Sequence, residues 1–234
     1  MYLGGIFMIQ RMALHTHLGD IQHYFNVHTI EKPHESKFNI SPTQSVTMIM
    51  NNRHQIKVID QARWGLFPYW APNSVNTTVK AILHKDYLHT LARRNRCIIP
   101  CTGFYGQRQF TEEKEQRAMH IVNPGQTMFG IAAIYDTIMD ANRVEMKIFT
   151  ILTEEMTGPF STWQARTPVI VHEDGIDAWL DRRNREIEPL LSTLVTLDSH
   201  ILKAYPVTNQ INDDYFENPD CVKEINVGFN LALD

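Results

Sequence analysis

Runs of Ile, Val, Phe and Thr, bounded by turn residues, recur along most of the chain and favour β-strands. The expected strands cover residues 45–50, 55–59 leading into Trp64, 96–100, 102–105, 128–135, 144–153 and 167–171. The string 38–44, which contains Ser41 and Pro42, is typical of an ordered loop. A chain with this many strands is expected to bury most of its apolar residues between sheets.

Apolar residues recur at helical spacing in three shorter segments. Leu18, Ile21 and Phe25 predict a helix over about residues 18–27. Residues 84–94 place their leucines on one face and predict an amphipathic helix. Glu173 and Asp174 open a third helix, where acidic side chains suit the helix dipole. Many strands with few helices predict an α+β fold, predominantly of curved or barrel-like antiparallel sheet. Because no linker or repeat marks a boundary, we expect a single domain over residues 1–234.

Composition places the chain among ordinary globular proteins. It has 234 residues, 43% of them hydrophobic, and a formal net charge of −4. No apolar run reaches the roughly 20 residues that cross a bilayer, and no secretory signal pattern is present. Cys97, Cys101 and Cys221 are odd in number and contain no C-x-x-C pair, which excludes a disulfide framework. We therefore expect a cytoplasmic protein without membrane contact.

Charge is distributed unevenly. Residues 53–117 carry 11 basic and 5 acidic side chains, a net charge of +6, whereas residues 118–234 carry 8 and 18, a net charge of −10. A basic segment within an acidic protein can offer a patch to a polyanion. The alternative is a solvated face without a partner.

The histidines could bind a metal and the cysteines could act as nucleophiles, but the sequence favours a structural role for both. His15, His17, His23, His28 and His34 lack the ligand spacing of a metal site, so no metal or other cofactor is expected. A nucleophilic cysteine needs a lowered pKa, and cysteine is among the most frequently buried residues. We therefore expect the cysteines to be buried structural residues.

The aromatic loop 63–71 is the most unusual stretch of the chain. It holds Trp64, Phe67, Tyr69 and Trp70 within seven residues. Such rings can stack on nucleobases, and each stacked base contributes about 1–3 kcal/mol. The alternative is that they fill one end of the core. Trp64 is the better core candidate and Trp70 the better surface candidate.

Several strings, in one order and spacing, resemble the SOS-response-associated peptidase (SRAP) family. They are FNISPTQ (38–44), RWGLFPYWA (63–71), VN (75–76), RCIIPCTGFY (96–105), FTILTEE (149–155), ARTPVI (165–170), AWLD (178–181) and AYPV (204–207). The resemblance spans about residues 38–210, and the first 37 residues match poorly.

The resemblance implies a DNA-damage response protein that binds single-stranded DNA and links covalently to abasic sites. In the family, a cysteine directly after the initiator methionine becomes the N-terminus. Its amine attacks the sugar aldehyde to give an imine, and its thiol closes a thiazolidine ring. An asparagine orients the group, while a glutamate and a histidine move protons. The peptidase activity removes whatever precedes that cysteine.

Most of the reacting residues are replaced in this sequence. The second residue is Tyr2, and the first cysteine is Cys97. Gly106 stands where the glutamate is expected, and Gln164 where the histidine is expected. Among the catalytic positions only Asn76 is retained. The resemblance therefore implies a chain that lacks the family's cross-linking chemistry.

The DNA-binding positions of the family are better retained. The resemblance assigns the groove to Pro42, Thr43, Trp70, Asn76 and Arg166. A guanidinium can pair with phosphate in a fixed fork.

Two further positions depart from the family pattern. Thr78 replaces an expected arginine, and Lys80 stands where an acid is usual.

Three hypotheses follow. The first is a single-stranded DNA binder that does not cross-link. The second is a residual enzyme whose N-terminal amine, with an ordinary pKa of about 7.7–8.0, forms a reversible imine. The third is a protein-interaction module that uses the acidic half of the chain.

Overall fold

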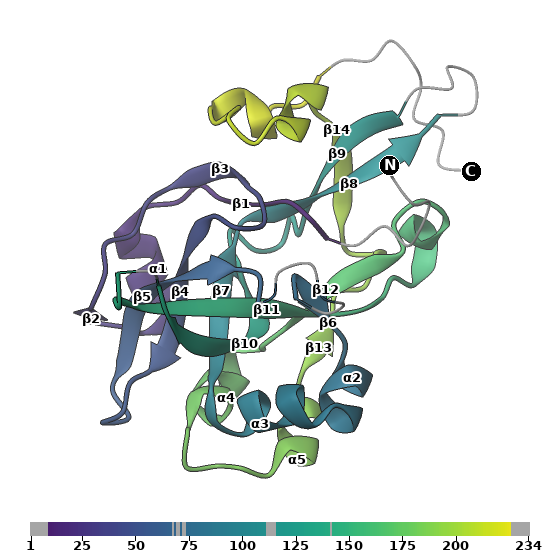
Figure 1. Ribbon diagram of the computed structural model, residues 1–234. Coiled ribbons are helices and arrows are strands. Elements are labelled where there is room, and N and C mark those ends of the chain that lie inside the picture. Colours follow the sequence, from purple (N-terminus) through teal and green to yellow (C-terminus); the bar gives the residue numbers. More distant parts are fainter. Residues whose placement is uncertain are drawn as a thin grey trace.

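The computed structural model describes residues 9–66, 68, 71, 74–110, 116–140 and 142–225 (Figure 1). Within this part, one sheet has the strand order β14-β9-β8-β1-β3 and is called sheet A. Its strands are β1 (Met12–Leu14), β3 (Lys37–Ile40), β8 (Gly103–Gln109), β9 (Gln116–Val122) and β14 (Lys203–Pro206).

The second sheet, sheet B, curves on itself. Strands β10, β7, β4, β5 and β11 pair in that order, and β11 pairs again with β10, so that the pairings form a ring. Its strands are β2 (Thr29–Ile30), β4 (Ser45–Asn51), β5 (Lys57–Trp64), β6 (Asn76–Thr77), β7 (Arg96–Cys101), β10 (Phe129–Met139), β11 (Glu145–Glu155), β12 (Arg166–Ile170) and β13 (Val195–Thr196).

Short helices cover the ends of this framework. Figure 1 shows α3, α4 and α5 gathered at one end of sheet B. The α-helices are α1 (Leu18–Phe25), α2 (Val79–His84), α3 (Asp86–Arg94), α4 (Ile176–Leu180) and α5 (Ile187–Leu191). Single 3₁₀ turns lie at Gly158–Thr162, Glu173–Gly175, Asn209–Asn212 and Pro219–Val222. None of the helices in the described ranges is long and apolar enough to cross a membrane.

The core contains the large apolar residues of both sheets. Trp64 is fully buried and its ring stacks on that of Phe149, with centroids 6.3 Å apart. This confirms the core assignment of Trp64. Cys97 and Cys101 are buried free thiols, and burial raises the pKa of Cys101 to about 12. Both therefore remain protonated and unreactive, as does the buried Cys221, whose thiol pKa is also raised by burial.

The expected strands of sheet B and the α+β class are confirmed, but four local predictions need correction. The loop predicted over 38–44 begins as β3, because it pairs with β1. The predicted strand 102–105 is the start of β8, which continues to Gln109. The helix predicted over 84–94 is α3, which begins at Asp86; His84 ends the preceding α2, and the extended backbone of Lys85 separates the two helices.

The predicted third helix opens as the 3₁₀ turn Glu173–Gly175 before α4. The sheets are predominantly antiparallel, as predicted, yet β11 runs parallel to β5 and β6, and β2 runs parallel to β5.

Candidate functional site

Asn76 lies in β6, which pairs with β11 through Ile151. Its side chain is 4% exposed, and its Nδ2 donates a hydrogen bond of 2.7 Å to the carbonyl oxygen of Ile9. Because a carbonyl oxygen can only accept, this contact fixes which end of the carboxamide faces Ile9. The other end, Oδ1, is buried without a partner in the described part of the chain.

A line of hydrogen bonds connects β6 to Arg166. The hydroxyl of Thr153, in β11, donates to the carbonyl oxygen of Thr77 (3.2 Å). Arg166 Nε donates to that same hydroxyl (2.9 Å), and Arg166 Nη2 donates to the carbonyl oxygen of Thr153 (2.5 Å). A guanidinium has five N–H donors. Thr153, which the sequence did not single out, thus orients the guanidinium of Arg166.

The side chain of Gln164 packs directly against Gly106. A Cβ atom on Gly106 would lie 2.4 Å from Gln164 Oε1 and 3.0 Å from the ring of Trp163. Gln164 is 1% exposed, and its Nε2 donates to the carbonyl oxygen of Arg166 (2.8 Å). Its Oε1 has no hydrogen-bond partner among the residues described. The side chain of Gln164 therefore occupies the volume that a larger residue at 106 would need.

Ile9 is the residue that the structure places beside Asn76. It is fully buried and lies shortly before β1; between them, the carbonyl oxygen of Arg11 accepts from the backbone N–H of Tyr105 (3.0 Å). Ile9 was not predicted as a site residue; the sequence feature that points to it is Met8, which directly precedes it as a methionine precedes the cysteine of the family. Tyr2 and Trp70, named as site positions from the sequence, lie outside the described residues.

The loop that holds Pro42 and Thr43 is tied to the same region by Trp64. The backbone N–H of Thr43 donates to the carbonyl oxygen of Trp64 (2.8 Å), and the indole N–H of Trp64 donates to that of Val75 (2.9 Å). Arg63 Nε donates to the carbonyl oxygen of Thr43 (3.0 Å). Thr43 has φ +74°, a left-handed conformation that costs about 1–3 kcal/mol in a non-glycine residue. Such strain persists where the surrounding structure enforces it.

Thr78 has a structural role in this arrangement. Its hydroxyl accepts from the backbone N–H of Ala81 (2.9 Å) and caps α2. Lys80 is exposed in the first turn of that helix. The side chains at 76, 106 and 164 carry no titratable group, so these three positions supply no general acid or base.

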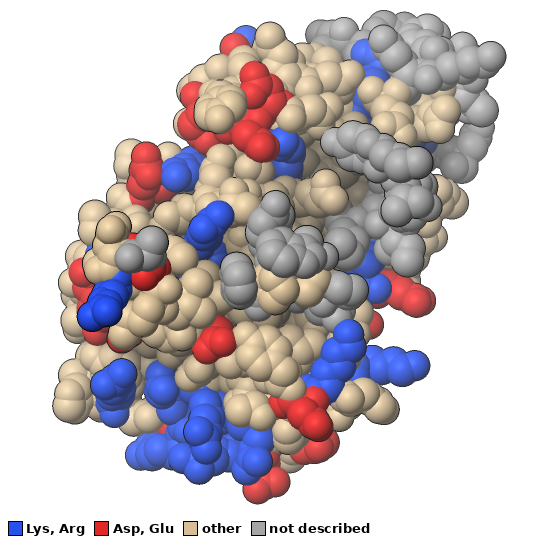
Figure 2. Space-filling view, viewed as in Figure 1, with Lys and Arg blue, Asp and Glu red and all other residues tan. Residues whose placement is uncertain are grey.

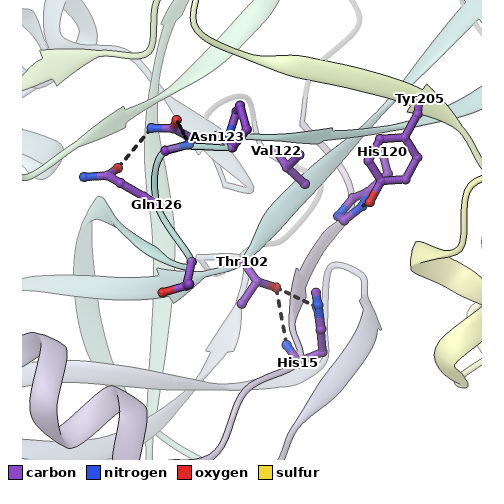
Figure 3. Close-up of a pocket in the computed structure, with 10 residues that line it drawn as sticks. His15, Thr102, His120, Val122, Asn123, Gln126 and Tyr205 are labelled. Atoms are coloured by element: carbon purple, nitrogen blue, oxygen red, sulfur yellow. Dashed lines mark hydrogen bonds between the residues drawn. The ribbon is translucent and has the colours of Figure 1, made fainter.

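A separate pocket of about 310 Å³ lies on sheet A (Figure 3). Its lining includes His15, Thr102, His120 and Tyr205. A Cβ on Gly103 would point at His120, whereas one on Gly106 would point at Gln164. Residues an odd number apart in a strand face opposite sides of the sheet, so this pocket and Gln164 lie on opposite faces of β8.

His120 is the buried polar group of this pocket. The hydroxyl of Tyr205 donates to the carbonyl oxygen of Val222, so it accepts from His120 Nδ1 (2.8 Å). Burial, and secondly His15, lower the pKa of His120 to about 3, so the imidazole is neutral at pH 7. Within the described ranges no three His, Cys, Asp or Glu residues cluster as a metal site would require.

Basic side chains gather on the surface where α3 and α4 lie (Figure 2). The last turn of α3 contributes Arg93 and Arg94, both exposed. They belong to the basic segment 53–117. Part of that charge thus forms a local surface patch.

The family comparison extends the resemblance toward the N-terminus. The model of the family described as "SOS response associated peptidase (SRAP)" matches residues 8–214. The matched range is therefore longer at this end than the range of about residues 38–210 over which the sequence strings resemble the family. The match begins next to Ile9, the residue that contacts Asn76.

Named relatives and solved structures agree with this match. The chain is 24% identical to the abasic site processing protein YoqW of Bacillus subtilis, over 92% of this chain and 99% of that protein. It is 23% identical to the abasic site processing protein HMCES of Xenopus tropicalis, over 82% of this chain and 67% of that protein. A crystal structure of a Bordetella bronchiseptica protein is similar in fold, with a TM-score of 0.71, 16% identity, and coverage of 86% and 100%.

Proposed function

Because the chain belongs to the SOS response associated peptidase family, we propose that it binds abasic sites in single-stranded DNA without linking to them covalently. Its relatives YoqW and HMCES carry the name of abasic site processing proteins, which supports abasic DNA as the ligand. The replaced side chains support binding without the covalent step.

The contact between Asn76 and Ile9 carries this proposal. Asn76 is the retained residue that orients the nucleophile in the family, and the main chain it contacts is that of Ile9. We infer that Ile9 occupies the position of the family's cysteine. Its side chain is an apolar hydrocarbon, so the thiol that closes the ring is not present there.

The other two reacting positions support the same reading. Gly106 has no side chain and Gln164 has a carboxamide, which neither gains nor loses a proton near neutral pH. Proton transfer to an imine or to a leaving peptide requires a titratable group within hydrogen-bond reach. We propose that cross-linking and self-processing are lost together.

The binding function rests on the groups that remain. Arg166 is held by Thr153 with donors to spare, and Arg63 is an exposed cation against the strained Thr43 loop. We propose that both contact phosphates and that the loop fixes their spacing. Each phosphate contact makes the affinity more dependent on salt.

The test is incubation of the full chain with abasic single-stranded DNA, with and without borohydride, followed by denaturing electrophoresis. We expect no shifted band in either arm. A band without borohydride would show that a stable link forms, and a band only with borohydride would show the reversible imine. Either band overturns the proposal. YoqW, run in parallel, checks the DNA substrate.

A fluorescence anisotropy titration tests binding itself. We expect the affinity for abasic single-stranded DNA to fall between 50 and 200 mM salt, as for other proteins that neutralise phosphates. An absence of binding at both salt concentrations would overturn the proposal and favour a protein-interaction module. The matched probe is an intact strand of the same sequence.

A further inference from the structure

Arg108 is a half-buried cation near the end of β8, and two aromatic rings hold its guanidinium. Its Cζ atom lies 5.0 Å from the centroid of the Phe110 ring and 5.8 Å from that of the Trp163 ring. A cation within about 6 Å of a ring centroid is attracted to the face of the ring, by about 0.5–1 kcal/mol at an exposed site. Such contacts use none of the five N–H donors of a guanidinium. No residue in the described part of the chain accepts a hydrogen bond from them.

Gly106 gives the ring of Trp163 its space beside Arg108. A Cβ on Gly106 would lie 3.0 Å from the Cζ3 atom of Trp163, which is closer than carbon atoms pack. Any larger residue at 106 would therefore displace this ring as well as Gln164. Arg108 lies two residues further along β8, so its side chain is on the same face of the strand as Gly106.

Two guanidinium groups thus approach the contact between Gly106 and Gln164 from different strands. Arg108 belongs to β8, and Arg166 is the first residue of β12. An internal sugar of a DNA strand carries one phosphate on each side. We propose that Arg108 binds the phosphate on one side of the abasic sugar, while Arg166 binds the phosphate on the other side. The proposal rests on the single-stranded DNA binding proposed above.

Phe110 and Trp163 are positioning residues for Arg108 in this arrangement. An arginine side chain has about 2 kcal/mol of rotamer entropy, part of which is lost when it binds a phosphate. Rings that restrict the guanidinium before the DNA arrives reduce the loss that occurs on binding. A guanidinium also binds phosphate through two parallel N–H groups, which an ammonium group does not. The charge of Arg108 and its restricted position therefore contribute separately to the affinity.

The first experiment measures the affinity for single-stranded DNA with one abasic site by fluorescence anisotropy at 50 and 200 mM salt. We expect Arg108→Gln to bind about tenfold more weakly at 50 mM salt and about fourfold more weakly at 200 mM, because one lost phosphate contact lowers the salt slope by about 0.7. Arg108→Lys should keep the wild-type slope and have an intermediate affinity. Arg53→Gln, at an exposed arginine in the turn between β4 and β5, is the matched control and should bind as the wild type does.

The second experiment tests the two rings. Trp163→Leu removes one ring and leaves the cation, so the affinity should fall about threefold with an unchanged salt slope. In the Arg108→Gln background the same change should have no further effect. A merely structural role of Trp163 would weaken binding in both backgrounds. Phe110→Leu repeats the test at the other ring, so the result does not depend on the folding of one variant.

The outcomes separate this inference from the proposed function. An unchanged salt slope in Arg108→Gln overturns the phosphate contact of Arg108, and so does an equal loss of affinity in Arg53→Gln. Additive losses for Arg108 and both rings overturn the positioning role of the rings. All of these results leave DNA binding intact. A wild-type chain that does not bind the abasic strand overturns the proposed function instead.

Discussion

Two buried asparagines perform opposite tasks in this protein. Asn39, in β3, is fully buried, and its Nδ2 contacts the carbonyl oxygens of Ile211, Asp213 and Phe216 at 2.9–3.0 Å. Its Oδ1 accepts from Arg11 Nη1 (2.9 Å). Asn76 is almost as buried, but within the described structure its side chain donates one hydrogen bond, to Ile9, and its Oδ1 has no partner.

Asn39 holds two segments of the folded chain together, whereas Asn76 lies in the proposed binding site. Around Asn39, Glu217 also accepts from the backbone N–H groups of Phe38 and Asn39, so that residues 211–217 are docked on β3. Every polar group there contributes to folding. Around Asn76 and Gln164 the fold keeps unsatisfied acceptors, each of which costs about 1–3 kcal/mol.

Replacing each asparagine should give the largest contrast. Asn39→Ala removes the contacts of Nδ2 with three carbonyl oxygens and of Oδ1 with Arg11, and it leaves buried carbonyl oxygens unpaired, so we expect a loss of about 3–5 kcal/mol in the free energy of unfolding. Asn76→Ala removes one bond and one unpaired acceptor, so we expect less than half of that loss. Urea denaturation of both variants measures the difference. Equal losses would contradict the division into clamp and site.

The buried His120 should make the free energy of unfolding depend on pH. Its pKa is about 3 in the folded protein, against about 6.5 when unfolded, so below pH 6.5 the unfolded chain binds more protons. The stability is complete above pH 6.5 and falls as the pH drops. From pH 7 to pH 5 we expect a loss of about 2 kcal/mol. His120→Gln should remove this part of the pH dependence in urea denaturation; an unchanged slope would exclude His120 as its source.

A double-mutant cycle examines the pair Gly106 and Gln164. Gly106→Ala places a Cβ against Gln164 Oε1 and should cost about 1–2 kcal/mol through overpacking. Gln164→Ala empties that volume, so Gly106→Ala should cost much less in its presence. The coupling is measured by urea denaturation of the two single variants and the double variant. Additive losses would show that the two side chains do not share the volume.

The smallest effect concerns phosphate contact. Arg166→Ala should reduce the slope of log affinity against log salt by about 0.7, the value for one phosphate of single-stranded DNA. Arg94→Ala, in the basic patch over α3, is the control for a general loss of positive charge. Anisotropy titrations at four salt concentrations measure both slopes. A larger change for Arg94 would relocate the DNA to the α3 patch.

The longer strands could be predicted from the pattern of apolar residues within each strand. β7 has all six residues buried and reads as an apolar run, and β10 and β11 are long and rich in Ile and Phe. The shorter strands could not be predicted in this way. β1 has three residues and β6 two, and both exist because a neighbouring strand supplies their hydrogen bonds. Such pairings depend on residues far away in the chain.

The sequence by itself determined the strand-rich class and, through its resemblance, the residue types at 76, 106, 164 and 166. Only the tertiary structure decided which of them meet. Ile9 and Asn76 are separated by 67 positions in the sequence, and the residues between them carry no local signal of their contact; neither do the residues between Gly106 and Gln164. The reason is physical: side-chain periodicity is set within a few residues, whereas convergence at a site depends on how distant strands pair and pack.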